Sequence, residues 1–250
     1  MSYRNIRPLH ILWQEGISDG VLNCVFLGIM RTLSLAEVLE DFPLRFFTQR
    51  RESDWLHKSG KLRAYRSLDW HIQEARICSK LPGHLNSTVL LNSLRDNQTN
   101  QAEPRYELVV VKEPLHWHNT SLRKVEGIGR HEQGAVLTTY RHSSKKNDGS
   151  EEEKKKRRLD FSLSMQMLVM HELGHVFGLF TKGTGKENPT DEEIKATHCL
   201  NDCVMYWQDD DELNKKIEPH PFCPSCLEKL KEYFVEPPTI IIDVDDPFDF

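Results

Sequence analysis

The segment HELGH, from His171 to His175, places two histidines four positions apart. On a helix this spacing puts both imidazoles on one face, where they can bind one metal ion. Glu172 follows the first histidine and can take a proton from a water that zinc activates, without being a ligand itself. The surrounding residues 160–180 are largely apolar, and histidines on a buried face need polar partners such as a metal. The sequence therefore predicts an active-site helix with a metal on one face, against the alternative of two surface histidines.

Gly178 follows His175 by three positions and extends the pattern beyond the five-residue motif. A glycine there can adopt positive φ, end the helix and turn the chain back towards the metal. This arrangement resembles that of metzincins, which also have a methionine in a turn beneath the metal, and Met205 is available for that role. Three positions after Gly178, where a third ligand is expected, the chain has Thr181. The third ligand must therefore come from elsewhere in the chain.

The chain has six cysteines, and four of them fall within 28 residues. These four are Cys199, Cys203, Cys223 and Cys226. They form two close pairs joined by a loop, a spacing suited to a closed tetrahedral thiolate zinc site with a structural role. The alternative is four buried cysteines without a metal. Cys24 and Cys78 stand alone in the sequence and are predicted to be small buried hydrophobes.

Taken together, the histidine and cysteine motifs resemble the archaemetzincin family. In that family a cysteine directly follows the third histidine, and a second cysteine stands two positions before the methionine. A spacer of seventeen residues then leads to a C-x-x-C pair. The corresponding residues here are His198, Cys199, Cys203, Met205, Cys223 and Cys226, with a seventeen-residue spacer at 206–222. The match covers residues 171–226.

The resemblance implies an α/β (α+β) fold of the zincin type, with two lobes, a mixed sheet, an active-site helix, a Met-turn and a C-terminal structural zinc site. It implies a zinc metallopeptidase with two zinc ions, one catalytic and one structural. Glu172 would be the general base and then the proton shuttle to the leaving amine. The ligands of the catalytic zinc would be His171, His175 and His198. The ligands of the structural zinc would be Cys199, Cys203, Cys223 and Cys226, and Met205 would form the Met-turn.

Two departures from the family pattern concern the third ligand. Residues 181–197 form an insertion before His198, and three residues separate Cys199 from Cys203 where the family has four. Lengthening a loop from about three to about twenty residues costs only about 1.5–2 kcal/mol of closure entropy, which zinc binding can offset. The stretch NPTDEEIKAT within the insertion is predicted to be a short capped helix. Asp191 is the alternative third ligand, although its place near this helix N-terminus favours capping.

The chain is predicted to consist of a mainly helical N-terminal region at 1–80 and a metallopeptidase domain at 81–250. Strands are predicted at 87–94, 106–113 and 134–141, where Val, Leu, Thr and Tyr are frequent. The nearly continuous apolar run from Tyr106 to Val111 is expected to be the central strand. The segment GAVLTTY, at 134–140, is predicted to be the sheet edge that pairs with an extended substrate.

The segment 143–158 is heavily charged and is predicted to be a solvated linker or a salt-bridged helical extension. The active-site helix is expected to begin after it, with Asp160 or Ser162 as the N-cap. The segment CPSCLEKLKEYF, from Cys223 to Phe234, is predicted to be a helix, and the proline- and aspartate-rich tail a final strand with a frayed end.

Composition narrows the possible partners and location. A net charge of −5 and a pI near 6.2 give no global attraction to nucleic acid or to an anionic membrane. No apolar run approaches the roughly 20 residues that span a bilayer, and the N-terminus does not resemble a secretory signal, so a cytoplasmic location is predicted. The expected partner is a peptide or protein substrate. The competing hypothesis is a catalytically inactive, zinc-stabilised interaction protein of the same fold, against which the intact Glu172 argues.

Overall fold

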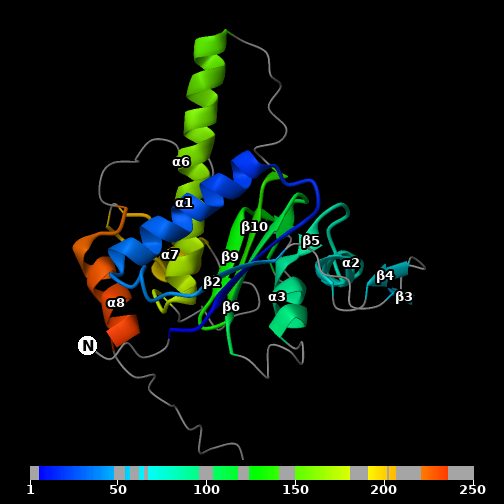
Figure 1. The fold of residues 1–250 in the computed structure, drawn as a ribbon, viewed down its shortest axis with the longest axis horizontal. Coiled ribbons are helices and arrows are strands. Elements are labelled where there is room, and N and C mark those ends of the chain that lie inside the picture. The colour runs from blue at the N-terminus through cyan, green and yellow to red at the C-terminus, as the bar shows by residue number, and fades with distance from the viewer. Residues whose placement is uncertain are drawn as a thin grey trace, which may run out of the picture.

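The computed structural model describes residues 6–47, 54–56, 62–64, 67–95, 104–117, 124–140, 150–180, 191–201, 203–206 and 221–235. Its centre is a five-stranded mixed sheet in the order β2-β1-β6-β10-β9 (Figure 1). The strands are β2 (Leu44–Phe47), β1 (Leu9–Trp13), β6 (Tyr106–Val111), β10 (Gly134–Thr138) and β9 (Gly127–Arg130). The first four run parallel, and β9 pairs antiparallel with β10 at one edge.

Strand β6 lies in the middle of the sheet and is buried along its whole length. Leu108 and Val110 face one hydrophobic cluster, whereas Val109 and Val111 face the other. A parallel strand covered on both faces is expected to be apolar at every position, and its side chains alternate between the two faces. The prediction of a central strand from Tyr106 to Val111 is therefore confirmed.

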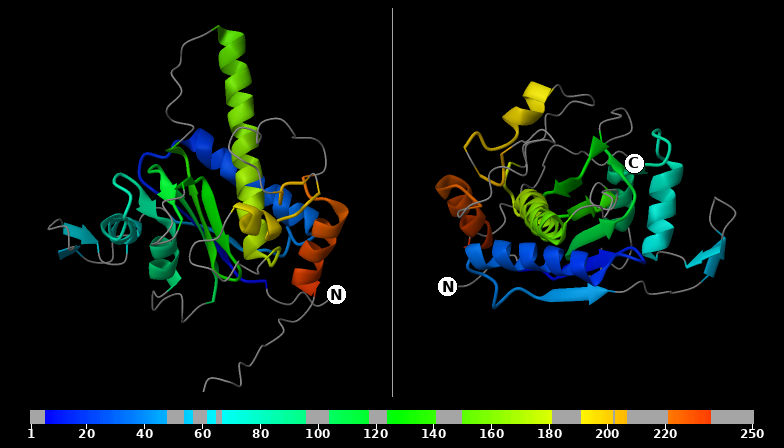
Figure 2. Two further views of the ribbon diagram at one scale, coloured as in Figure 1. Left: turned by 180° about the vertical axis from the view of Figure 1, so that it is seen from behind. Right: turned by 90° about the horizontal axis from the view of Figure 1, so that it is seen from above.

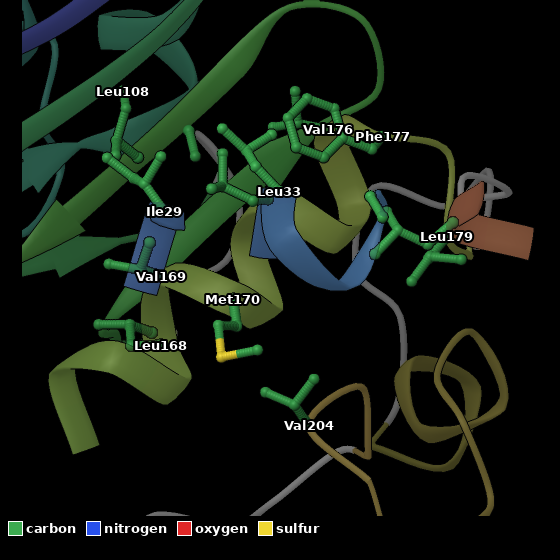
Figure 3. Close-up of a cluster of buried hydrophobic side chains, with 14 of the residues drawn as sticks. Ile29, Leu33, Leu108, Leu168, Val169, Met170, Val176, Phe177, Leu179 and Val204 are labelled. Atoms are coloured by element: carbon green, nitrogen blue, oxygen red, sulfur yellow. The ribbon is translucent and has the colours of Figure 1, made fainter. Parts of the chain in front are cut away.

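Helices cover both faces of the sheet (Figure 2). One face packs against α1 (Asp19–Leu35) and α6 (Glu151–Val176), and the other against α2 (Leu68–Ile77) and α3 (Ser87–Arg95). Figure 3 shows Ile29 and Leu33 of α1, Val169 of α6 and Leu108 of β6 in the hydrophobic cluster on the face covered by α1 and α6. The C-terminal helix α8 (Pro224–Val235) joins the same cluster through Phe234, whose ring centroid lies 5.0 Å from that of Phe177. The expected α/β fold with a mixed sheet and a long active-site helix is confirmed.

Six smaller elements complete the described fold. Strands β3 (Asp54–Leu56) and β4 (Leu62–Ala64) form an antiparallel pair, and α7 (Asp191–Ala196) lies in the predicted short helix of the insertion. A second small sheet has the order β5-β7-β8, with β5 at Leu85–Asn86, β7 at Leu115–His116 and β8 at Lys124–Val125.

The segment 87–94 was predicted to be a strand and is helix α3. Leu90, Leu91 and Leu94 are buried against the sheet at a spacing of three and four residues. This period matches one face of a helix, and burial of that face outweighs the preference of Thr and Val for strands. The prediction of a strand was wrong because it followed the strand-favouring residue types in this segment and not the helical spacing of its leucines.

The first 80 residues were predicted to be mainly helical, which holds for α1 and α2 but not for β1 and β2. Strand β1 pairs with β6, so residues 6–47 share the main sheet and its core with the rest of the domain. The four- and five-residue strands are too short to produce a strong period of two. The predicted C-terminal strand lies outside the described residues.

Helix α6 begins earlier than predicted, at the N-cap Ser150 rather than Asp160 or Ser162. Ser150 accepts a hydrogen bond from the backbone N–H of Glu153, whose carboxylate accepts one from the backbone N–H of Ser150. This capping box stabilises the helix end. The charged segment from 150 is thus a helical extension, exposed to solvent and projecting beyond the sheet (Figure 1). Among the described helices, none is both long and apolar enough to cross a membrane.

Gly28 brings α1 and α6 into close contact. A Cβ atom at this position would lie 2.7 Å from the Val169 Cβ and 2.9 Å from the Gln166 carbonyl oxygen. We expect Gly28→Ala to destabilise the protein by about 1–3 kcal/mol through overpacking, although alanine favours a helix over glycine by about 1 kcal/mol. Urea denaturation will measure the change. Gly20→Ala is the matched control, because the nearest atom to its Cβ would be the Ser18 hydroxyl oxygen at 3.9 Å, and it is expected not to destabilise.

Candidate metal centres

Three histidines converge beside the buried end of α6. His171 and His175 project from one face of the helix, and His198 follows α7. The ring centroid of His198 lies 5.3 Å from that of His171 and 5.1 Å from that of His175. One nitrogen of each ring lies within 4.8 Å of the others. The structure therefore brings together the three histidines of the predicted catalytic site, including the one beyond the insertion.

The ring nitrogens of His171 and His175 are arranged as metal ligands require. The Nδ1–H of His171 donates to the Val204 carbonyl oxygen at 2.7 Å, and the Nδ1–H of His175 donates to the Leu179 carbonyl oxygen at 3.0 Å. These bonds fix the tautomer, so each Nε2 presents its lone pair to the centre of the group. The two Nε2 atoms lie 3.2 Å apart, close to the roughly 3.3 Å expected for tetrahedral zinc with Zn–N bonds of about 2.0 Å.

Burial also keeps these imidazoles neutral. Burial, followed by the neighbouring His198, lowers the pKa of His171 to about 4. The pKa of His175 lies well below its usual value, first because of burial and then because of the other two histidines. A histidine must be neutral to bind a metal, so His171 and His175 can bind zinc without losing a proton at neutral pH.

The Gly178 turn places the carbonyl group that orients His175. Gly178 has a φ of +91°, and Phe180 also has positive φ at 55°. The N–H of Leu179 donates to the Gly174 carbonyl oxygen, which closes the helix end and leaves the Leu179 carbonyl oxygen pointing at His175. The predicted role of Gly178 is confirmed. Residues 181–190 lie outside the described part of the chain, as does the side chain of Asp191, the alternative ligand.

Glu172 lies beside the histidines on α6 and is 5% exposed. Its carboxylate accepts a hydrogen bond from the backbone N–H of Gly129, in strand β9. Burial raises its pKa to about 8, and the Gly129 bond partly opposes this. Within the described residues the histidine group contains no carboxylate, so Glu172 is placed next to the candidate metal position without belonging to the ligand set.

The strand next to Glu172 differs from the one predicted. Segment 134–140 was expected to form the sheet edge, but β10 lies between β6 and β9, and β9 is the edge strand. The sequence of β9, GIGR, has two glycines among four residues and therefore little strand propensity. Glycines at alternate positions in a strand indicate that another backbone approaches closely. The two glycines were therefore the sequence signal from which β9 could have been predicted.

Met205 lies directly against the active-site helix, as the Met-turn prediction requires. A Cβ atom at Gly174 would overlap the Met205 sulfur and lie 3.1 Å from its Cε, so this glycine makes room for the methionine. Met205 is fully buried, and the carbonyl group of the preceding Val204 accepts the His171 hydrogen bond. The turn thus supports the histidine site from below by packing and by one hydrogen bond.

We expect Met205→Leu to cost under about 1.5 kcal/mol of stability, because the two side chains are close in volume. Zinc content should stay at the wild-type level, since the methionine contacts the helix and supplies no ligand. Met205→Ala leaves a cavity and is expected to cost about 2–5 kcal/mol. Urea denaturation and metal analysis of both variants will check this. Loss of zinc from the leucine variant would show that the sulfur does more than fill space.

The second group contains the four clustered cysteines, all buried and all free of disulfide bonds. The sulfur atoms of Cys199 and Cys223 lie 3.7 Å apart, and those of Cys203 and Cys226 lie 3.9 Å apart. Tetrahedral zinc with Zn–S bonds of about 2.3 Å requires sulfur separations of about 3.8 Å. The four thiols are therefore already spaced as the ligands of one zinc ion.

Hydrogen-bond donors and a helix N-terminus surround the cysteine group. The backbone N–H of Asn201 donates to the Cys199 sulfur at 3.4 Å, and its side-chain amide donates to the Cys223 sulfur at 3.5 Å. Hydrogen bonding between Cys203 and Cys226 lowers the pKa of Cys203 to about 5, whereas the same interaction raises the pKa of Cys226 and burial raises that of Cys199. Cys223 and Cys226 also stand at the N-terminus of α8, where helical N–H groups stabilise negative charge.

The two groups share one short loop. Cys199 directly follows His198, and Cys203 directly precedes Val204, whose carbonyl group orients His171. The N–H of Cys199 donates to the Met205 carbonyl oxygen at 2.9 Å, which closes the loop between them. Whatever holds the cysteines in place therefore also holds two parts of the histidine site.

The two isolated cysteines lie away from both groups. Cys24 is buried in the main core, as predicted. Cys78 is exposed, because it caps the C-terminus of α2 rather than facing the core, so the prediction that it is buried was wrong.

Comparison with known proteins supports the fold assignment. No protein-family model and no curated protein sequence matches the chain. Among solved structures, archaemetzincin from Methanopyrus kandleri has a TM-score of 0.57 at 19% identity, covering 92% of this chain and 96% of that one. Metalloproteinase-II from Bacteroides fragilis has a TM-score of 0.46 at 11% identity, covering 92% of this chain and 53% of that one. The similarity to the archaemetzincin structure confirms the predicted resemblance for the fold.

Proposed function

We propose that this protein is a zinc-dependent metallopeptidase that hydrolyses peptide bonds. The observation that carries the proposal is the meeting of three histidines, with two Nε2 atoms 3.2 Å apart, beside a carboxylate that is outside the ligand set. Zinc held by His171, His175 and His198 would supply Lewis acidity, which polarises the scissile carbonyl group and lowers the pKa of the attacking water.

Glu172 is the general base in this proposal. Its carboxylate takes the proton of the attacking water and then gives it to the leaving amine. The position of Glu172 next to His171 on α6 keeps the carboxylate close to the metal position while its own hydrogen bond points to β9. The neutral Nδ1–H groups of His171 and His175 stay bonded to backbone carbonyl groups and take no part in the proton transfer.

Strand β9 is the proposed binding edge for an extended peptide substrate. The N–H of Thr138 in β10 donates to the carbonyl oxygen of Glu126, and hydrogen-bonded pairs alternate along an antiparallel ladder. The backbone groups of Gly127 and Gly129 therefore point away from β10. Because the Gly129 N–H already donates to Glu172, the groups offered to a substrate are those of Gly127 and the carbonyl group of Gly129. A substrate chain can pair with such an edge by main-chain hydrogen bonds. This assigns to β9 the role that the sequence suggested for 134–140.

The four cysteines are proposed to hold a second, structural zinc. Four protein ligands leave no position for water, so the cysteine site has no catalytic role of its own. A catalytically inactive interaction protein with the same fold is the second candidate, favoured by the insertion before His198. The main support for an inactive protein was the displacement of the third ligand along the sequence. His198 nevertheless lies next to His171 and His175, which argues against an inactive protein.

Two measurements test the proposed function. Metal analysis of the purified protein is expected to give two zinc ions per chain, one for each ligand group. A fluorogenic peptide library is expected to reveal cleavage that a chelator removes and added zinc restores. One zinc or none would contradict the two-site assignment, and two zinc ions with no cleavage of any peptide would favour the inactive interaction protein.

A further inference from the structure

The two glycines of β9 face Glu172 across a very short distance. Gly127 and Gly129 are alternate residues of the strand, so they share the face that contacts α6. A Cβ atom at Gly127 would lie 2.7 Å from the Oε1 atom of Glu172 and 2.9 Å from its carboxyl carbon. Real Cβ atoms do not come this close, so any larger residue at Gly127 must displace the carboxylate.

Gly129 acts on the same residue in a different way. Its backbone N–H donates to the Glu172 carboxylate. A Cβ atom at Gly129 would overlap the backbone carbonyl oxygen of Glu172 and lie 3.0 Å from the Cβ of His175. The absence of a side chain therefore lets the strand come close enough to the helix for this hydrogen bond. Ile128, between the two glycines, packs on the opposite face of the sheet.

We infer that Gly127 and Gly129 are positioning residues for the Glu172 carboxylate. Gly129 holds it by a hydrogen bond, and the missing side chain at Gly127 leaves the room that the carboxylate occupies against the strand. The inference rests on the proposed function, because the orientation of Glu172 matters to the reaction only if this residue is the base. The contact itself is a property of the folded chain and is testable without any substrate.

The selective variant is Gly127→Ala, because the three atoms nearest to its new methyl group are all side-chain atoms of Glu172. We expect kcat for the best library peptide to fall about 10²-fold, since displacement of a reacting group by about 1 Å has this effect. KM should change much less, because the backbone of β9 remains. Zinc stoichiometry should stay at wild type, because the three nearest atoms to the new methyl group all belong to Glu172 and none to a histidine. Gly20→Ala, in open space on α1, is the matched glycine control and should leave kcat unchanged.

A double-mutant cycle in thermal unfolding separates this inference from the proposed function. Gly127→Ala is expected to lower the Tm of the zinc-loaded protein by about 2–4 °C. In a Glu172→Ala background the atoms that it would meet are absent, so the same substitution should leave Tm nearly unchanged. Equal Tm losses in both backgrounds would overturn the inference even if peptide cleavage were established. If the Tm loss of Gly127→Ala depended on Glu172 in a protein that cleaves no peptide, the contact would exist while the proposed function fails. Coupling together with an unchanged kcat would also overturn it, because the contact would not position the base.

Gly129→Ala provides the second arm of the test. Its methyl group would meet backbone atoms of α6, which cannot move as a side chain does. We expect a larger Tm loss than for Gly127→Ala, and one that persists in the Glu172→Ala background. A Gly129→Ala protein as stable as wild type would show that β9 does not approach α6 as closely as the inference requires.

Discussion

Replacement of Glu172 by alanine is expected to abolish peptide hydrolysis and to leave the zinc content at two ions per chain. The reason is that a general base is not a ligand, and within the described residues the histidine group contains no carboxylate. General acid–base catalysis contributes about 10²–10⁴-fold to a rate, so residual activity should fall at least into this range. Peptide cleavage and metal analysis on the same preparation will measure both quantities.

His171→Ala is the matched comparison for Glu172→Ala. It removes a ligand, so hydrolysis and the catalytic zinc should be lost together, and only the zinc at the cysteine group should remain. If Glu172→Ala kept most of the wild-type activity, the proton transfer proposed for this residue would be wrong. If it lost one zinc ion as well, Glu172 would have to be counted among the ligands.

Removal of one structural ligand is expected to weaken both metal sites, whereas removal of a catalytic ligand should weaken only one. Cys223→Ser disrupts the cysteine group, which fixes Cys199 beside His198 and Cys203 beside the Val204 carbonyl group. Loss of groups that orient metal ligands typically reduces metal affinity about 10–100-fold, and we expect this effect at the histidine site. His198→Ala should weaken the catalytic zinc and leave the cysteine site filled.

Cobalt(II) substitution can report on the two sites separately, because thiolate ligands give charge-transfer bands that imidazole ligands lack. A chelator that competes with the protein for zinc will then be titrated. Zinc loss from each site will give the affinity of that site in the wild type and in both variants. An unchanged affinity at the histidine site in Cys223→Ser would show that the shared loop does not transmit the effect. An unchanged catalytic zinc in His198→Ala would mean that the third ligand lies elsewhere, with Asp191 the first candidate.

The histidine and cysteine groups were predictable because their signals are local or depend on fixed spacing. His171 and His175 need only a helix to face the same way, and α6 provides it. The cysteine group follows from two pairs and the spacer between them, although the sequence does not show that four sulfur atoms will reach zinc-binding separations. His198 was predicted through the family resemblance, because no local pattern links a residue beyond an insertion to a helix before it.

Strand β9 and helix α3 were not predictable by the same means. Four residues with two glycines carry almost no strand signal, and β9 is a strand because β10 and α6 fix its position. Helix α3 has residues that favour strands locally, but burial of one helical face against the sheet decides its structure. In both cases tertiary contacts outweigh local propensity. The start of α6 was also missed, because its charged first turns looked like a linker although Ser150 and Glu153 form a capping box.

The shared loop has a consequence for protein engineering. Phe180 is fixed by the Gly178 turn, and His198 is held from its C-terminal side through Cys199. The Gly178 turn and Cys199 thus anchor the two ends of residues 181–197, and a hydrogen bond of 3.2 Å between the Thr197 hydroxyl and His198 Nδ1 adds to the second anchor. Each doubling of the length of this segment would cost only about 0.6 kcal/mol in closure entropy. A binding module or an affinity tag could therefore be grafted between residues 181 and 190 without a change to any of the proposed metal ligands.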